Sequence, residues 1–67
     1  MNETEKAKFL QVYSNLPINE RKNVIVVLEK DDKEKQPISW DIAYIEIEKE
    51  TEIGDKILKK LIKLDLI

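Results

Sequence analysis

The sequence contains no cysteine and no histidine, and only one glycine among its 67 residues. Without cysteine the chain forms no disulfide, and without either residue it offers no thiolate or imidazole ligand to a metal. The commonest general base and the commonest low-pKa nucleophile are therefore both absent. A single glycine also excludes a glycine-rich phosphate loop. These absences argue against an enzyme, and we predict no catalytic residue, no cofactor, no metal and no small-molecule substrate.

Long apolar runs are also lacking. No stretch approaches the length that a membrane-spanning helix needs, and no signal peptide is recognisable. We therefore expect a soluble protein of the cytoplasm that does not bind membranes. The polar stretch 29–36 is expected to be a loop. Its acids Asp31, Asp32 and Glu34 lack the alternating spacing and the glycine of a calcium loop, so no cation site is predicted there.

The composition is instead rich in charge. Charged residues make up 39% of the chain and hydrophobic residues 42%, with a formal net charge of −2. The charged share is well above the usual quarter, but the net charge is not that of a nucleic-acid-binding protein. A chain of this length forms one domain, residues 1–67, and buries only about 60% of its unfolded surface. Its core is marginal, so association into a homo-oligomer or with another protein is expected.

The first half of the chain reads as a helix followed by a strand. Residues 2–16 have helical periodicity, with Asn2 as the N-cap and Pro17 as the stop. Residues 17–22 form a connection or a single helical turn. Residues 23–28 are apolar and mostly β-branched, which predicts a strand covered on both faces. A β-hairpin is an alternative, with residues 37–40 as the return strand.

Residues 38–50 are ambiguous between helix and strand. As a helix, the stretch is capped by Ser39 and aligns Trp40, Tyr44 and Ile47 on one side. As a strand, residues 45–48 alternate well. We favour the helix, because alanine and glutamate are poor strand formers. The helix leaves Ile42 and Ile45 on a second apolar side, which needs cover and predicts a protein interface there.

Residues 51–67 carry the clearest helical signal, with Thr51 as the N-cap. The apolar residues from Ile53 to Leu64 share one side, and the last hydrophobic residues are expected to tuck in. Four lysines project from the opposite side: Lys56, Lys59, Lys60 and Lys63. They form either a plain solvated face or a contact surface for nucleic acid or an acidic partner. Local pairs with Asp55 and Glu52, or with the acidic segment 41–52, would use part of this charge.

The predicted core takes in the apolar side of each element. It comprises Phe9, Leu10, Tyr13, Leu16, Val24, Val26, Leu28, Trp40, Ala43, Tyr44, Ile47, Ile57, Leu58, Leu61 and Leu64. The aromatic residues Tyr13, Trp40 and Tyr44 anchor this core or, alternatively, line a pocket or stack on bases.

Residues 42–67 resemble a helix-turn-helix or winged-helix domain. The resemblance rests on the turn Glu50-Thr51-Glu52-Ile53-Gly54 and on the leucine-spaced run from Ile57 to Ile67. It implies a helix pair whose second helix contacts nucleic acid near Asp55, Lys56 and Lys59. The segment departs from the family in its shortened second helix, in an aspartate where glycine is usual, and in the lack of a wing. The strand followed by two helices is also similar to the ribbon-helix-helix order.

The sequence therefore predicts a small α+β domain with the order helix, strand or hairpin, helix, helix. Its predicted function is that of a non-enzymatic protein-interaction or assembly module that self-associates through Ile42 and Ile45. The alternative is a small nucleic-acid-binding regulator that uses the lysine face.

Overall fold

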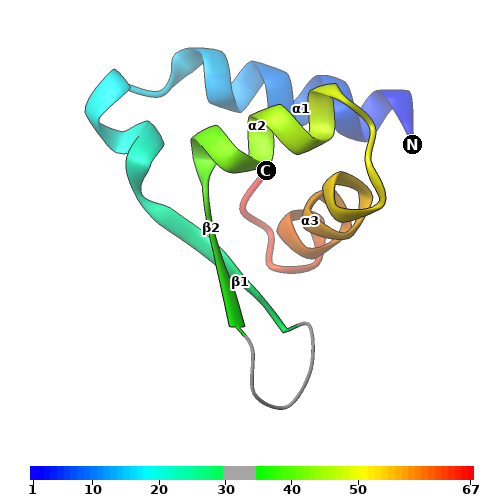
Figure 1. The fold of residues 1–67 in the computed structure, drawn as a ribbon. Coiled ribbons are helices and arrows are strands. Elements are labelled where there is room, and N and C mark those ends of the chain that lie inside the picture. The colour runs from blue at the N-terminus through cyan, green and yellow to red at the C-terminus, as the bar shows by residue number, and fades with distance from the viewer. Residues whose placement is uncertain (30–34) are drawn as a thin grey trace.

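The computed structural model describes residues 1–29 and 35–67. The chain forms helix α1 (Glu3–Asn15), a short 3-10 helix η1 (Ile18–Lys22), strands β1 (Val24–Glu29) and β2 (Lys35–Ser39), and helices α2 (Trp40–Glu48) and α3 (Glu52–Lys63). Figure 1 shows α1, α2 and α3 gathered at one end, with the hairpin of β1 and β2 extending away from them. The predicted α+β class and the order helix, hairpin, helix, helix are confirmed.

Each α-helix begins at the N-cap residue that the sequence predicted. The side chains of Asn2, Ser39 and Thr51 accept the backbone N–H of the residue three positions later. Each bond satisfies one of the backbone donors that a helix start leaves free. The stretch that was ambiguous in the sequence is a helix and not a strand: α2 runs from Trp40 to Glu48, with Ser39 as its N-cap.

Helices α2 and α3 end through the same left-handed turn. Glu50 has a φ of 54°, and its N–H donates to the carbonyl of Ile47 at 3.1 Å while Thr51 N–H donates to the carbonyl of Glu46 at 3.2 Å. This pair of bonds is a Schellman motif, which usually places glycine at the left-handed position. α3 ends in the same way at Asp65, with a φ of 58°. The turn between α2 and α3 is therefore short and fully hydrogen-bonded.

The two strands form an antiparallel hairpin with one face in the core. Val26 pairs with Ile38 and both are buried, whereas Val27 pairs with Pro37 and both are exposed. Cover of both strand faces by helices of the same chain is therefore wrong, because Val27 on the second face is exposed; cover of that face by a partner chain stays a prediction. The register shifts between Val24 and Val26, so Val24 does not share the buried face with Val26 as strict alternation would require.

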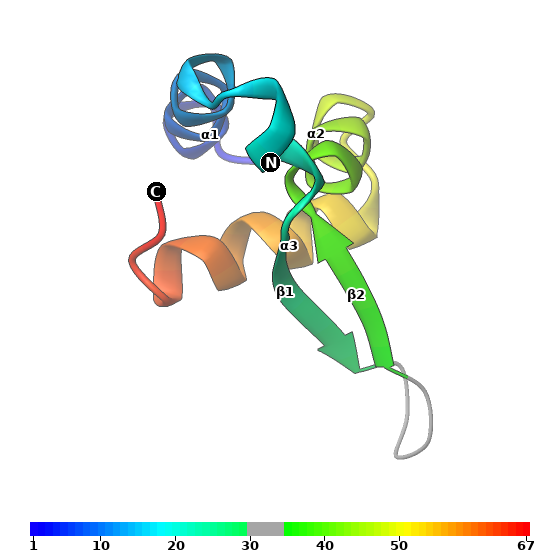
Figure 2. The same cartoon turned by 90° about the vertical axis from the view of Figure 1, so that its left-hand side faces the viewer.

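Figure 2 shows the hairpin from the side, with α3 crossing behind β1, and the two elements are in contact. Glu29 belongs to β1, and Lys35 and Gln36 belong to β2, so these three residues of the predicted loop 29–36 lie in strands. The loop and cation-site expectations for Asp31, Asp32 and Glu34 lie outside the described residues. No helix in the described part of the chain is both long and apolar enough to cross a membrane.

The core lies where the three helices meet the inner face of the hairpin. Its buried residues are Phe9, Val26, Ile38, Trp40, Ala43, Ile47, Ile57, Leu58 and Leu61. Most of the remaining predicted core residues are partly buried against this cluster. The prediction that Val24 and Leu64 belong to the core is wrong, since their side chains are 56% and 51% exposed. Val24 precedes the register shift, and Leu64 is the C-cap where the chain leaves α3.

Candidate functional site

The outer side of α2 is apolar where a solvent-facing helix is usually polar. Trp40, Ala43 and Ile47 face the core, whereas Ile42 is 40% exposed and Ile45 is 48% exposed. The two isoleucines are three residues apart, so their side chains are neighbours on the helix surface. The structure thus places both predicted interface residues on one exposed side of α2. We call Ile42 and Ile45 the α2 outer face.

Contacts with α1 hold α2 firmly in place. The rings of Trp40 and Phe9 stack with centroids 5.9 Å apart. Tyr13 of α1 stacks on Tyr44 at 4.5 Å with an interplanar angle of 9°, and its hydroxyl donates to Asp41 Oδ1 at 2.7 Å. Side chains at three positions of α2 are therefore fixed against α1. The outer face is presented on a rigid element rather than on a loop.

The Tyr13–Asp41 bond gives a pH-dependent contribution to stability. The bond to the Asp41 carboxylate, followed by burial, raises the pKa of Tyr13 above its ordinary value of 10.0. A raised pKa means that this contribution is present below pH 10 and is lost as the pH rises through the raised pKa. We expect Tyr13→Phe to lower the free energy of unfolding by about 1 kcal/mol at pH 7. In urea titrations the difference from the wild type should shrink above pH 10; a constant difference would contradict the bond.

At the joint between α2 and α3, the backbones of the two helices approach each other closely. Thr51 Oγ1 donates to Glu46 Oε2 at 2.6 Å and accepts the N–H of Gly54 at 2.9 Å. Gly54 lies directly against the α2 backbone: a Cβ there would overlap the carbonyl oxygen of Glu46 and lie 2.9 Å from the nitrogen of Ile47. Only glycine allows the helices to approach this closely. The sequence offered Gly54 as part of a turn but did not predict this contact.

The lysines of α3 do not form one free stripe. Lys56, Lys59 and Lys63 are exposed, but Lys60 is partly buried and its Nζ donates to the Val27 carbonyl of β1 at 3.0 Å. The sequence placed Lys60 with the others because periodicity does not show how far a long side chain reaches.

One more lysine of α3 forms an ion pair within the helix. Lys59 Nζ lies 2.9 Å from Asp55 Oδ2, which confirms the predicted pair, and this hydrogen bond raises the pKa of Lys59. Glu52 and Lys56, both described, form no ion pair. Glu50 of the acidic segment lies 4.0 Å from Lys6 of α1 instead of meeting the lysines of α3. Two of the four lysines, Lys59 and Lys60, thus contact other groups of the chain.

A second surface feature was missed by sequence reasoning. A groove of about 470 Å³ runs between α1 and α2 beside η1. The guanidinium of Arg21 lies 4.4 Å from the centre of the Tyr13 ring at this groove. No sequence signal pointed to Arg21, because its contacts are with a residue of another helix. Tyr13 and Tyr44 line this groove and also pack against the core, whereas stacking on bases stays a prediction.

Within residues 1–29 and 35–67, no three acidic side chains gather as a metal site would require. Comparison of the chain with protein-family models, with curated proteins and with solved structures finds no match in any of the three.

Proposed function

We propose that this chain is a small, non-enzymatic protein-interaction module that assembles with a second copy of itself through the α2 outer face. The observation that carries the proposal is the half-exposure of Ile42 and Ile45 on a helix whose opposite side is in the core. Apolar side chains at two adjacent positions on a firmly held helix make a contact surface that is already in place before binding.

The pattern along α2 favours a second copy as the partner. Asp41 lies four residues before Ile45 and Lys49 lies four residues after it, so all three follow one side of the helix. If two α2 helices pair antiparallel about a two-fold axis at Ile45, Lys49 of each copy lies across from Asp41 of the other, whose Oδ1 also accepts the Tyr13 hydroxyl of its own chain. A two-fold interface requires this kind of self-complementary surface. The charges thereby favour the register that brings the isoleucines together.

The expected affinity is modest. Burying the exposed half of one isoleucine contributes about 1 kcal/mol, and a symmetric dimer buries four such side chains. Together the four side chains contribute about 4 kcal/mol, which by itself corresponds to a dissociation constant of about 1 mM. Because association also costs translational and rotational freedom, we expect a weak, reversible dimer with a dissociation constant on the order of 1 mM and no tighter.

Replacing both isoleucines, as Ile42→Gln/Ile45→Gln, is expected to abolish the association. Glutamine is a good helix former, so the helix should persist while its apolar surface is lost. Sedimentation equilibrium from about 10 μM to 2 mM, the range set by the expected affinity, measures the result. Val27→Thr is the matched control, because Val27 is also 40% exposed but lies on the hairpin. A wild-type chain that stays monomeric at the highest concentration, or a double variant that still associates, would refute the proposal.

Nucleic-acid binding through α3 is the second candidate. The short turn between α2 and α3 and the exposed Lys56, Lys59 and Lys63 favour it, as does the resemblance to helix-turn-helix domains. It ranks second because Lys59 forms an ion pair with Asp55 and Lys60 donates a hydrogen bond to the hairpin. Acidic Glu52 and Asp55 also lie in the first turn of α3, where they would repel phosphate.

Fluorescence anisotropy separates the two candidates. The first proposal predicts no salt-dependent binding to mixed-sequence duplex DNA or single-stranded RNA. Binding that weakens steeply between two salt concentrations would indicate phosphate contacts. If Lys56→Glu/Lys63→Glu removed that binding while Ile42→Gln/Ile45→Gln preserved it, the second candidate would replace the first. Lys60 is left unchanged in this test because its substitution would also disturb the hairpin.

A further inference from the structure

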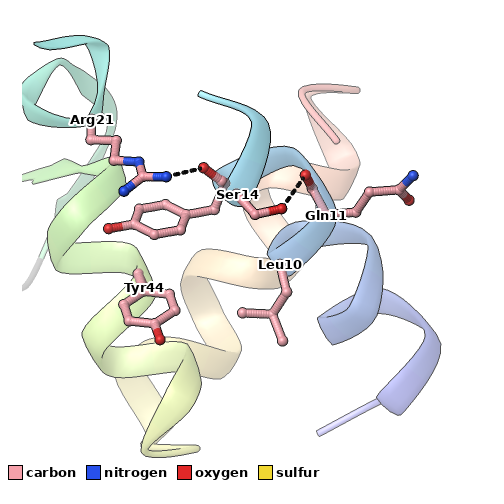
Figure 3. A pocket seen from close by; sticks show the side chains of 6 residues that line it. Leu10, Gln11, Ser14, Arg21 and Tyr44 are labelled. Atoms are coloured by element: carbon pink, nitrogen blue, oxygen red, sulfur yellow. Dashed lines mark hydrogen bonds between the residues drawn. The ribbon is translucent and has the colours of Figure 1, made fainter. Parts of the chain in front are cut away.

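The groove between α1 and α2 combines apolar and cationic chemistry on a side of α2 different from its outer face. It is lined by Leu10, Gln11, Tyr13, Ser14, Arg21 and Tyr44, with a volume of about 470 Å³. This volume is within the range of small-molecule sites. In Figure 3, Leu10 and Tyr44 point into the same space from the two helices, while the amide of Gln11 points away from it. The groove thus has an apolar wall made by two elements.

Arg21 supplies the cationic end of the groove. Its Nη2 donates to the carbonyl of Tyr13 at 3.2 Å, and its guanidinium stacks on the Tyr13 ring. These two contacts fix the orientation of a partly buried guanidinium. Its Nε atom is buried without an acceptor among the described residues, and no described carboxylate lies within ion-pair distance of it. The buried Nε is not itself accessible to a ligand, but the guanidinium lines the groove, and its charge and planar shape match those of a carboxylate.

The apolar wall determines what the carboxylate must be attached to. Tyr44 stacks nearly parallel on Tyr13, so the facing sides of these two rings cover each other, and the rest of the Tyr44 ring forms the apolar wall of the groove together with Leu10. Flat aromatic surfaces favour aromatic or branched aliphatic groups. We propose that this groove binds a small organic acid, in which a carboxylate is joined to an aromatic or branched aliphatic group. The carboxylate pairs with Arg21, and the apolar group packs on Tyr44 and Leu10.

NMR titration of the isotope-labelled chain with phenylacetate tests the proposal. We expect saturable amide shifts at Leu10, Ser14, Arg21 and Tyr44, with a dissociation constant on the order of 1 mM. Phenethylamine carries the same ring with the opposite charge, and acetate carries the charge without the ring. Neither should saturate these shifts. Equal binding of phenethylamine, or phenylacetate shifts confined to the lysines of α3, would overturn the proposal.

Two variants test separately the contact to the carboxylate and the contact to the apolar group. Arg21→Gln should weaken phenylacetate binding at least about tenfold, while Lys22→Gln, the same charge change at the exposed neighbouring position, should leave it unchanged. Tyr44→Ala keeps Arg21 on the Tyr13 ring and should also weaken binding, which keeps the test valid if Arg21→Gln does not fold. An equal loss in Lys22→Gln, or no loss in either groove variant, would contradict the assignment. If only a peptide ending in phenylalanine bound, a peptide site would replace the small acid.

Discussion

Replacing Gly54 with alanine is expected to destabilise the protein by about 3 kcal/mol, although alanine is the better helix former. Helix propensity alone predicts a gain of about 1 kcal/mol. The added Cβ would overlap the Glu46 carbonyl oxygen and lie 2.6 Å from its carbonyl carbon. Backbone atoms cannot rotate away as a side chain does, so α2 and α3 must separate and lose packing. A chain of this length has a total stability of about 3–10 kcal/mol, so the substitution should remove between about a third and all of it.

Urea unfolding followed by the fluorescence of Trp40 measures this effect, because Trp40 is the only tryptophan and is buried. Lys56→Ala is the control, since it changes an exposed position of the same helix and should alter stability by less than about 0.5 kcal/mol. The sign of the Gly54→Ala effect is decisive. Stabilisation by about 1 kcal/mol would mean that α2 and α3 do not touch at this point.

Replacing Ile38 with alanine is expected to lower the free energy of unfolding by about 2–4 kcal/mol. Ile38 is fully buried and pairs with Val26 on the inner face of the hairpin. Truncation removes apolar contacts and leaves a cavity that the short strand cannot close. The loss is large compared with the stability available to a chain of this size. Urea unfolding again provides the measurement.

Val24→Ala is the matched comparison for Ile38→Ala. Both residues belong to the hairpin, but Val24 is 56% exposed. We expect a loss below about 1 kcal/mol, mostly from strand propensity. A Val24→Ala loss as large as that of Ile38→Ala would mean that the register has no shift between Val24 and Val26, and that strict alternation places Val24 in the core.

The helices could be predicted from the sequence because their signals are local. Asn2, Ser39 and Thr51 cap helices whose starts need only the next three residues. The hairpin depended on a longer-range pairing, and the sequence left it as an alternative to a lone strand. Ile38 was missed in the core because it stands between Pro37 and Ser39 without apolar alternation. Val24 was wrongly placed there because a register shift leaves no trace in the hydrophobic pattern.

Of the two candidate surfaces, the α2 outer face could be predicted from the sequence and the groove at Arg21 could not. Ile42 and Ile45 follow from helical periodicity, since a helix with its core side at Trp40, Ala43 and Ile47 must turn these two residues outward. The groove at Arg21 does not follow from any pattern. Tyr13 and Tyr44 are far apart in sequence, and their stacking exists only because α1 packs on α2. Contacts that depend on how helices are arranged cannot be read from periodicity within one helix.

The most direct test of self-association is an isotope-filtered NOE measurement on a mixture of labelled and unlabelled chains. One half of the sample carries ¹³C-labelled isoleucine methyl groups and the other half is unlabelled, at about 1 mM, near the expected dissociation constant. The proposed dimer predicts NOEs from the methyl groups of Ile42 and Ile45 to protons of α2 in the other copy. NOEs that connect α3 or the hairpin between copies, or no intermolecular NOE at that concentration, would contradict the proposal.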